Sequence, residues 1–155
     1  MPNGVEEEEF PVYEAPPVVV PTSRLREAIE KWKQAPPYEG VRAGDLSDFR
    51  ALDPEVINKI EIILEAMDWP QLIVFHYGDS DRVVAPFVIG VSSEGNALMR
   101  GFQLEGVSRS GKGAGWRVFQ IQKMENIENH QDFFNADEFD FDRFYPWTYK
   151  VFAML

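Results

Sequence analysis

The sequence predicts an α+β protein in which two N-terminal helices pack on a small antiparallel sheet or barrel. Between residues 24 and 67, apolar residues recur every three or four positions, which is the helical period. From residue 71 onward, four segments rich in β-branched and aromatic residues are separated by short loops, which is typical of an antiparallel meander. At 155 residues, 45% of them hydrophobic, the chain can bury one ordinary core.

The first two regions of the chain differ sharply in composition. Residues 1–21 hold four consecutive glutamates and several prolines, and they predict a mobile arm because they cannot bury enough surface to offset the entropy of ordering. Residues 22–70 predict a helical segment. Its first helix covers residues 24–34 and ends before Pro36. The second begins after Asp53, an N-cap residue followed by proline at the first helical position.

The third region, residues 71–155, predicts the β domain. Strands are expected at residues 71–77, 82–91, 97–106 and 116–127, and the second of them is interrupted by Pro86. The final apolar run is consistent with either a closing strand or a short helix.

Composition excludes several classes of protein. The chain has no apolar run near the roughly 20 residues needed to cross a bilayer, and its acidic N-terminus differs from a secretory signal, so we expect a cytoplasmic protein without a membrane partner. The absence of cysteine excludes disulfides, thiolate catalysis and cysteine-based zinc sites. Two histidines with no triad spacing, and acids without an EF-hand pattern, predict neither an enzyme nor a metal or other cofactor.

Charge is distributed unevenly along the chain. The net charge is −11, which argues against the coating of a nucleic acid duplex. Residues 71–123, however, hold six Lys and Arg against four Asp and Glu, whereas the remainder holds nine against 22. A mildly basic centre between acidic flanks favours a small anionic ligand.

The glycine-rich stretch at residues 106–113, GVSRSGKG, differs from a P-loop in its last letter. A P-loop needs a following helix, whose N–H groups bind phosphate, and a Ser or Thr that holds Mg²⁺. Here Gly113 replaces the Ser or Thr, and a predicted strand follows. We therefore interpret the stretch as a loop between strands, with Arg109 and Lys112 either keeping it soluble or closing over an anion.

The order of motifs from residue 56 to residue 127 resembles the WYL domain family and, more closely, small stand-alone bacterial and phage proteins related to it. The matching positions are Tyr77, Arg82, Val83, Pro86, Gly95, Gly101, Phe102, Arg117, Phe119 and Met124. The resemblance implies a strongly bent SH3-like or Sm-like barrel and an anion pocket. The chain departs from the pattern at residues 97–99, where Ala-Leu-Met replaces Trp-Tyr-Leu, and at residues 120–123. The DNA-reading winged helix usual in the family is not expected here.

Eight residues are candidates for binding the ligand. Three arginines on separate predicted strands present planar donors suited to phosphate or carboxylate, although they are equally consistent with a solvated face. Three aromatic residues could stack on a base, although aromatic residues in strands more often belong to a core. With the two loop cations, the candidates are Tyr77, Arg82, Arg100, Phe102, Arg109, Lys112, Trp116 and Arg117.

These observations predict a non-enzymatic binding module for a small anionic ligand, a nucleotide or short oligonucleotide. It would act by sequestering the ligand or by signalling to a partner protein, and a homodimer is a further candidate assembly. The acidic flanks support an alternative, an interaction protein that mimics nucleic acid charge and blocks a basic groove on its partner.

Overall fold

The computed structural model describes residues 23–34, 42–50, 52–106, 113–142 and 150–155, so the predicted arm at residues 1–21 lies outside the described residues. Both predicted helices are confirmed, as α1 (Ser23–Gln34) and α2 (Pro54–Asp68). The strands are β2 (Gln71–Tyr77), β3 (Ser80–Val91), β4 (Ala97–Glu105), β5 (Gly115–Gln120), β6 (Glu125–Phe133) and β7 (Lys150–Met154). Short 3₁₀ turns occur at η1 (Leu46–Asp48), η2 (Ile121–Lys123) and η3 (Ala136–Glu138).

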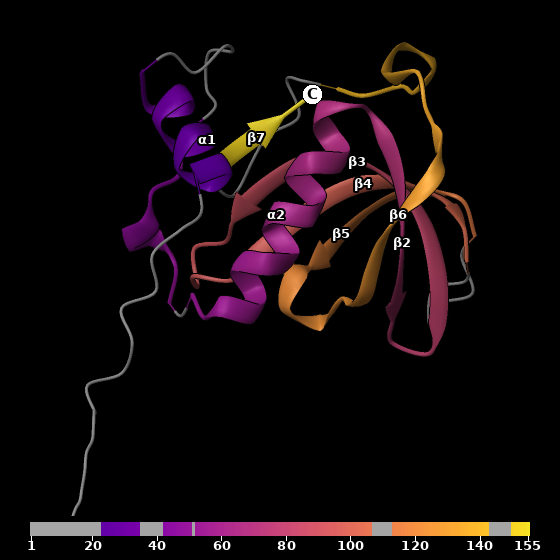
Figure 1. Cartoon of the computed structure of the whole chain (residues 1–155), viewed down its shortest axis with the longest axis horizontal. Helices are drawn as coiled ribbons and strands as arrows, with labels where there is room; N and C mark the ends of the chain where they lie inside the picture. The colour runs from indigo at the N-terminus through magenta and orange to yellow at the C-terminus, as the bar shows by residue number, and fades with distance from the viewer. Residues whose placement is uncertain (1–22, 35–41, 51, 107–112, 143–149) are drawn as a thin grey trace, which may run out of the picture.

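Helix α2 begins where its sequence predicts. The Asp53 side chain accepts a hydrogen bond from the Val56 backbone N–H at 2.9 Å, and Pro54 occupies the first turn. The cap satisfies an N–H group that has no partner inside the helix. The apolar stripe of α2 is buried, and Ile60 and Ile63 within it are fully inaccessible to solvent. Figure 1 shows α2 lying across one face of the sheet, with α1 beside β7.

The six strands form one antiparallel sheet in the order β5-β4-β3-β2-β6, and β7 pairs with β3. The fold is therefore α+β, as predicted. The sheet is not closed, because no pairing joins β5 to β6 among the described strands, so the predicted barrel is not confirmed. Strand β3 passes through Pro86 with a register shift between Pro86 and Val88, which agrees with the confinement of proline to bulges and edges.

The strand predicted at residues 116–127 is wrong as a single element. Turn η2 divides it into β5 and β6. Ile121 and Met124, three residues apart, are both fully buried, and the Met124 N–H donates to the Ile121 carbonyl at 3.0 Å. A 3₁₀ turn brings residues i and i+3 to the same side, whereas a continuous strand would have turned them to opposite faces. The closing segment is a strand, β7, rather than a helix.

Two apolar clusters cover the two faces of the sheet. On the face under α2, the cluster contains Phe75, Met99 and Phe119 together with the helix stripe. On the other face, Phe87 contacts Trp116 and the segment around Phe139. Because both faces are covered there, the central strand β3 carries buried apolar residues at consecutive positions from residue 84 to residue 91.

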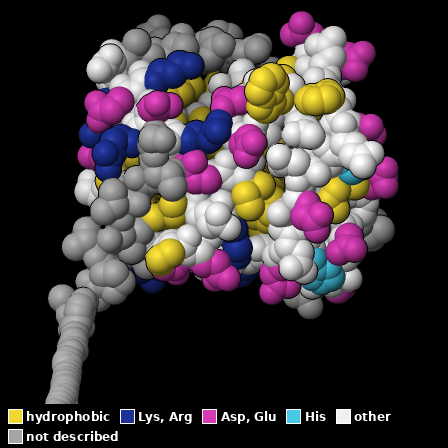
Figure 2. All heavy atoms as spheres, viewed as in Figure 1, with side chains coloured by type: hydrophobic (Ala, Val, Ile, Leu, Met, Phe, Trp, Pro, Cys, Tyr) yellow, Lys and Arg dark blue, Asp and Glu magenta, His cyan; other side chains and the backbone are white. Residues whose placement is uncertain are grey.

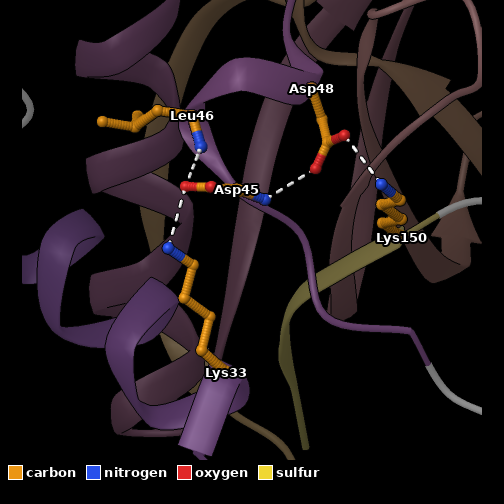
Figure 3. Close-up of polar contacts among 5 residues, drawn as sticks. All are labelled: Lys33, Asp45, Leu46, Asp48 and Lys150. Atoms are coloured by element: carbon orange, nitrogen blue, oxygen red, sulfur yellow. Dashed lines mark hydrogen bonds and ion pairs between the residues drawn. The ribbon is translucent and has the colours of Figure 1, made fainter.

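A group of charged side chains joins α1, η1 and β7 (Figure 3). The Lys33 Nζ and the Leu46 N–H both donate to Asp45, at 3.1 and 2.7 Å, and Lys150 Nζ donates to Asp48 at 2.8 Å. The hydrogen bond from Lys33, followed by that from the Leu46 N–H, lowers the pKa of Asp45 below its ordinary value. This carboxylate therefore stabilises the contact above its unfolded pKa, and the contribution is lost as the pH falls through the folded pKa.

None of the helices in the described ranges is long and apolar enough to cross a membrane.

Candidate functional site

A cavity of about 350 Å³ opens on the face of the sheet that carries Phe119, between the β2–β3 hairpin and β5. Three of its side chains are cations and two are aromatic. The lining consists of Tyr77, Gly78, Arg82, Arg117, Val118, Phe119 and Lys123.

Arg82 forms the inner wall of this cavity and is only 4% exposed. Its hydrogen bonds go to neutral oxygens, from Nε to Ser80 Oγ at 2.9 Å and from one terminal nitrogen to the Tyr77 carbonyl at 3.1 Å. The guanidinium also lies 5.5 Å from the centroid of the Tyr77 ring and 5.9 Å from that of Phe119. These contacts hold the side chain in place through dipoles and aromatic faces, and none of them neutralises its positive charge.

Gln103 connects Arg82 to the ends of the glycine-rich loop. The Gln103 side chain is fully buried, and its Oε1 accepts a hydrogen bond from Arg82 at 3.1 Å. Its Nε2 donates to the carbonyls of Gly106 at 3.0 Å and Gly113 at 3.1 Å. One neutral amide therefore fixes a cation on one side and the two described ends of the loop on the other.

Arg117 and Lys123 supply the remaining positive charge. Arg117 donates to the Gly113 carbonyl at 2.7 Å and to the Trp116 carbonyl at 2.9 Å, and both acceptors are neutral. Among the described residues, no ion pair joins a carboxylate to any of the three cations that line the cavity. A buried cation without an anionic partner is costly, and an incoming anion reduces that cost.

The structure brings together three of the predicted site residues, Tyr77, Arg82 and Arg117. Arg100, Phe102 and Trp116 lie on the opposite face of the sheet. The Arg100 guanidinium stands 5.0 Å above the Trp116 ring, and Phe102 packs edge-on against Trp116 with ring centroids 5.5 Å apart. Phe102 and Trp116 belong to the packing around Phe87, and Arg100 covers the Trp116 ring. Arg109 and Lys112 lie outside the described residues.

Sequence reasoning missed Gln103 and Lys123. Gln103 lies on the same face of β4 as Met99 and Gly101, which are both buried. A polar residue two positions after Gly101, on this inward-facing side, was the signal that could have identified it. Lys123 is the last residue of η2, a 3₁₀ turn that was predicted as strand, and no local signal places it in the same cavity as Arg82.

A histidine and an aspartate pair across the hairpin that carries Arg82. His76 Nδ1 and Asp81 Oδ1 are 2.8 Å apart, on exposed side chains. The hydrogen bond to Asp81, followed by the charges of Asp81 and Glu125, raises the pKa of His76 above its ordinary value. The pair therefore stabilises the hairpin below the unfolded pKa of His76, and the contribution is lost as the pH rises through the folded pKa.

We expect Asp81→Asn to lower the pKa of His76 toward its ordinary value, because the variant removes the charged acceptor. The measurement is an NMR titration of the His76 ring protons. Asp79→Asn, in the same turn, is the matched control and should leave the pKa of His76 closer to that of the parent protein. An equal shift in both variants would contradict the role of the Asp81 hydrogen bond.

The fold and the cavity thus define an α+β protein with a cationic cavity on one face of an open sheet. No family model matches the chain, and no curated protein matches it. A similar solved structure is proteasome accessory factor B/C (PafBC) of Arthrobacter aurescens, at 20% identity and a TM-score of 0.40. The match covers 74% of this chain and 20% of that protein, so the chain spans about a fifth of its length. The resemblance to the WYL domain family therefore rests on the sequence motifs between residues 77 and 124.

Proposed function

We propose that the protein is a non-enzymatic binding module for a small anionic ligand, a nucleotide or a short oligonucleotide, bound in the cavity of Arg82, Arg117 and Lys123. The observation that carries the proposal is the buried guanidinium of Arg82, whose hydrogen bonds among the described residues all go to neutral oxygens. Such a group retains its full charge for a ligand, and arginine is well suited to bind phosphate or carboxylate.

The surroundings of the cavity favour a small ligand over a long duplex. Its volume of about 350 Å³ is near the lower end of ligand-binding cavities, which run from roughly 300 to 1,000 Å³. On the face shown in Figure 2, acidic side chains are spread between the basic ones, and most of the Lys and Arg side chains lie on the side of α1. Binding of a duplex depends instead on many cations that face phosphates together.

Arg117→Gln is expected to weaken the binding of adenosine 5′-monophosphate by about tenfold to a hundredfold, since a hydrogen bond to a charged group contributes about 1.5–3 kcal/mol. Isothermal titration calorimetry gives the dissociation constants. Arg26→Gln is the matched control, because it removes the same charge from an exposed position on α1 and should leave the affinity within about twofold.

Two results of this experiment would contradict the proposal. Equal losses in Arg117→Gln and Arg26→Gln would show that binding depends on overall charge rather than on the cavity. Conversion of the nucleotide during incubation, detected by chromatography of the recovered ligand, would replace a binding module with an enzyme. Recovery of intact nucleotide is the expected outcome.

A further inference from the structure

The hydrogen-bonding capacity of the cavity indicates which anion it binds, an inference that rests on the proposed function. Arginine has five N–H donors and lysine has three. Within the described residues, Arg82 uses three of its donors on Ser80, Gln103 and Tyr77. Arg117 uses two, on Trp116 and Gly113. Two donors of Arg82 and three of Arg117 are thus not used by these contacts, and Lys123 adds its ammonium group.

The charge of the cavity favours a ligand that carries more than one negative charge. Three cations line it, and among the described residues none of them pairs with a carboxylate. One negative charge would leave an excess of positive charge beside Arg82, which has little access to water. A second negative charge on the same group is therefore favoured here more strongly than it is at an exposed site, where water screens both charges.

Phosphate monoesters and phosphodiesters differ in their negative charge and in their number of acceptor oxygens. A terminal phosphate monoester carries a charge of about −1.5 to −2 at pH 7 and presents three strong acceptor oxygens. The internal phosphodiester of an oligonucleotide or a cyclic nucleotide carries one negative charge and has two non-bridging oxygens. The monoester matches a cavity rich in donors and positive charge, and a cavity of about 350 Å³ has room for a chain end rather than for a strand passing through it.

We propose that the cavity recognises the terminal phosphate monoester of its ligand, so that a nucleotide 5′-monophosphate or the phosphorylated end of a short oligonucleotide binds and an internal or cyclic phosphodiester does not. Arg117 and Lys123 contact the terminal oxygens, and Arg82 supplies positive charge from the inner wall.

The test compares matched ligands that differ in one phosphate substituent. Adenosine 5′-monophosphate is compared with its 5′-methyl phosphodiester and with 3′,5′-cyclic adenosine monophosphate, and a 5′-phosphorylated thymidine dinucleotide with the same dinucleotide lacking that phosphate. Ribose 5-phosphate and inorganic phosphate show whether the base contributes. Calorimetry should give at least about tenfold tighter binding for each monoester than for its diester or unphosphorylated partner, the discrimination expected from one charge-assisted hydrogen bond.

Two variants that each remove one positive charge test whether this preference depends on the cavity. Lys123→Gln changes an exposed side chain at the cavity and should reduce the ratio of monoester to diester affinity, whereas Arg26→Gln on α1 should preserve it. Monoesters and diesters that bind equally well would overturn the monoester inference while leaving the binding module in place. A folded protein that binds none of these ligands would overturn both the inference and the proposed function.

Discussion

Replacing Gln103 with leucine is expected to lower the free energy of unfolding by about 3 kcal/mol or more, measured by urea denaturation. The substitution keeps a buried side chain of similar size but removes an amide that serves three partners. Arg82 loses one of its three acceptors, and the Gly106 carbonyl loses its donor from Gln103. The Gly113 carbonyl loses the same donor but keeps the hydrogen bond from Arg117. A buried polar group left without a partner costs about 1–3 kcal/mol, and more when the group is charged.

The matched control is Gln122→Leu, an exposed glutamine in η2, which should change the free energy of unfolding by less than about 0.5 kcal/mol. The binding of adenosine 5′-monophosphate should also weaken in Gln103→Leu, because Arg82 loses a contact that positions it. If Gln103→Leu were as stable as the control, the network from Arg82 to the loop ends would not contribute to the fold.

Gly101→Ala is expected to destabilise the protein by about 3 kcal/mol, near the upper end of the usual cost of overpacking. A Cβ atom at Gly101 would lie 2.5 Å from the Ala85 carbonyl oxygen and 2.6 Å from Val84 Cγ1. Because the first of these atoms is backbone in the adjacent strand, the clash cannot be relieved by a side-chain rotation. Gly101 pairs with Pro86 beside the register shift of β3, so the missing side chain allows the two strands to approach closely at the bulge.

Gly113→Ala is the matched control, since a Cβ atom there meets nothing within 4 Å among the described residues. Its melting temperature should stay within about a degree or two of the parent value, whereas that of Gly101→Ala should fall by roughly 6–12 °C, at about 2–4 °C per kcal/mol for a chain of this size. Similar melting temperatures for the two variants would show that β3 and β4 can separate at the bulge at little cost.

The sequence by itself determined the helices and most of the strands, because these depend on short-range patterns. The spacing of Ile60, Ile63 and Met67 and the Asp53 cap define α2 without reference to the rest of the chain. The β2–β3 hairpin follows from two extended runs around Gly78, which adopts a positive φ of 67°. The hairpin places Tyr77 and Arg82 close together, since Arg82 donates a hydrogen bond to the Tyr77 carbonyl.

The tertiary structure decided which arginines share a site. Arg100 and Arg117 are both flanked by uncharged, mostly apolar residues in the sequence. Strands β4 and β5 pair so that Arg117 stands opposite Gly101 and Arg100 stands opposite Val118. Side chains directly opposite in a sheet share a face, so the two arginines project from opposite faces. Apolar side chains cover both faces of this sheet, so the apolar residues that flank each arginine in the sequence do not show which face the arginine occupies. The composition of the cavity therefore depends on strand register, which is set by contacts between residues far apart in the chain.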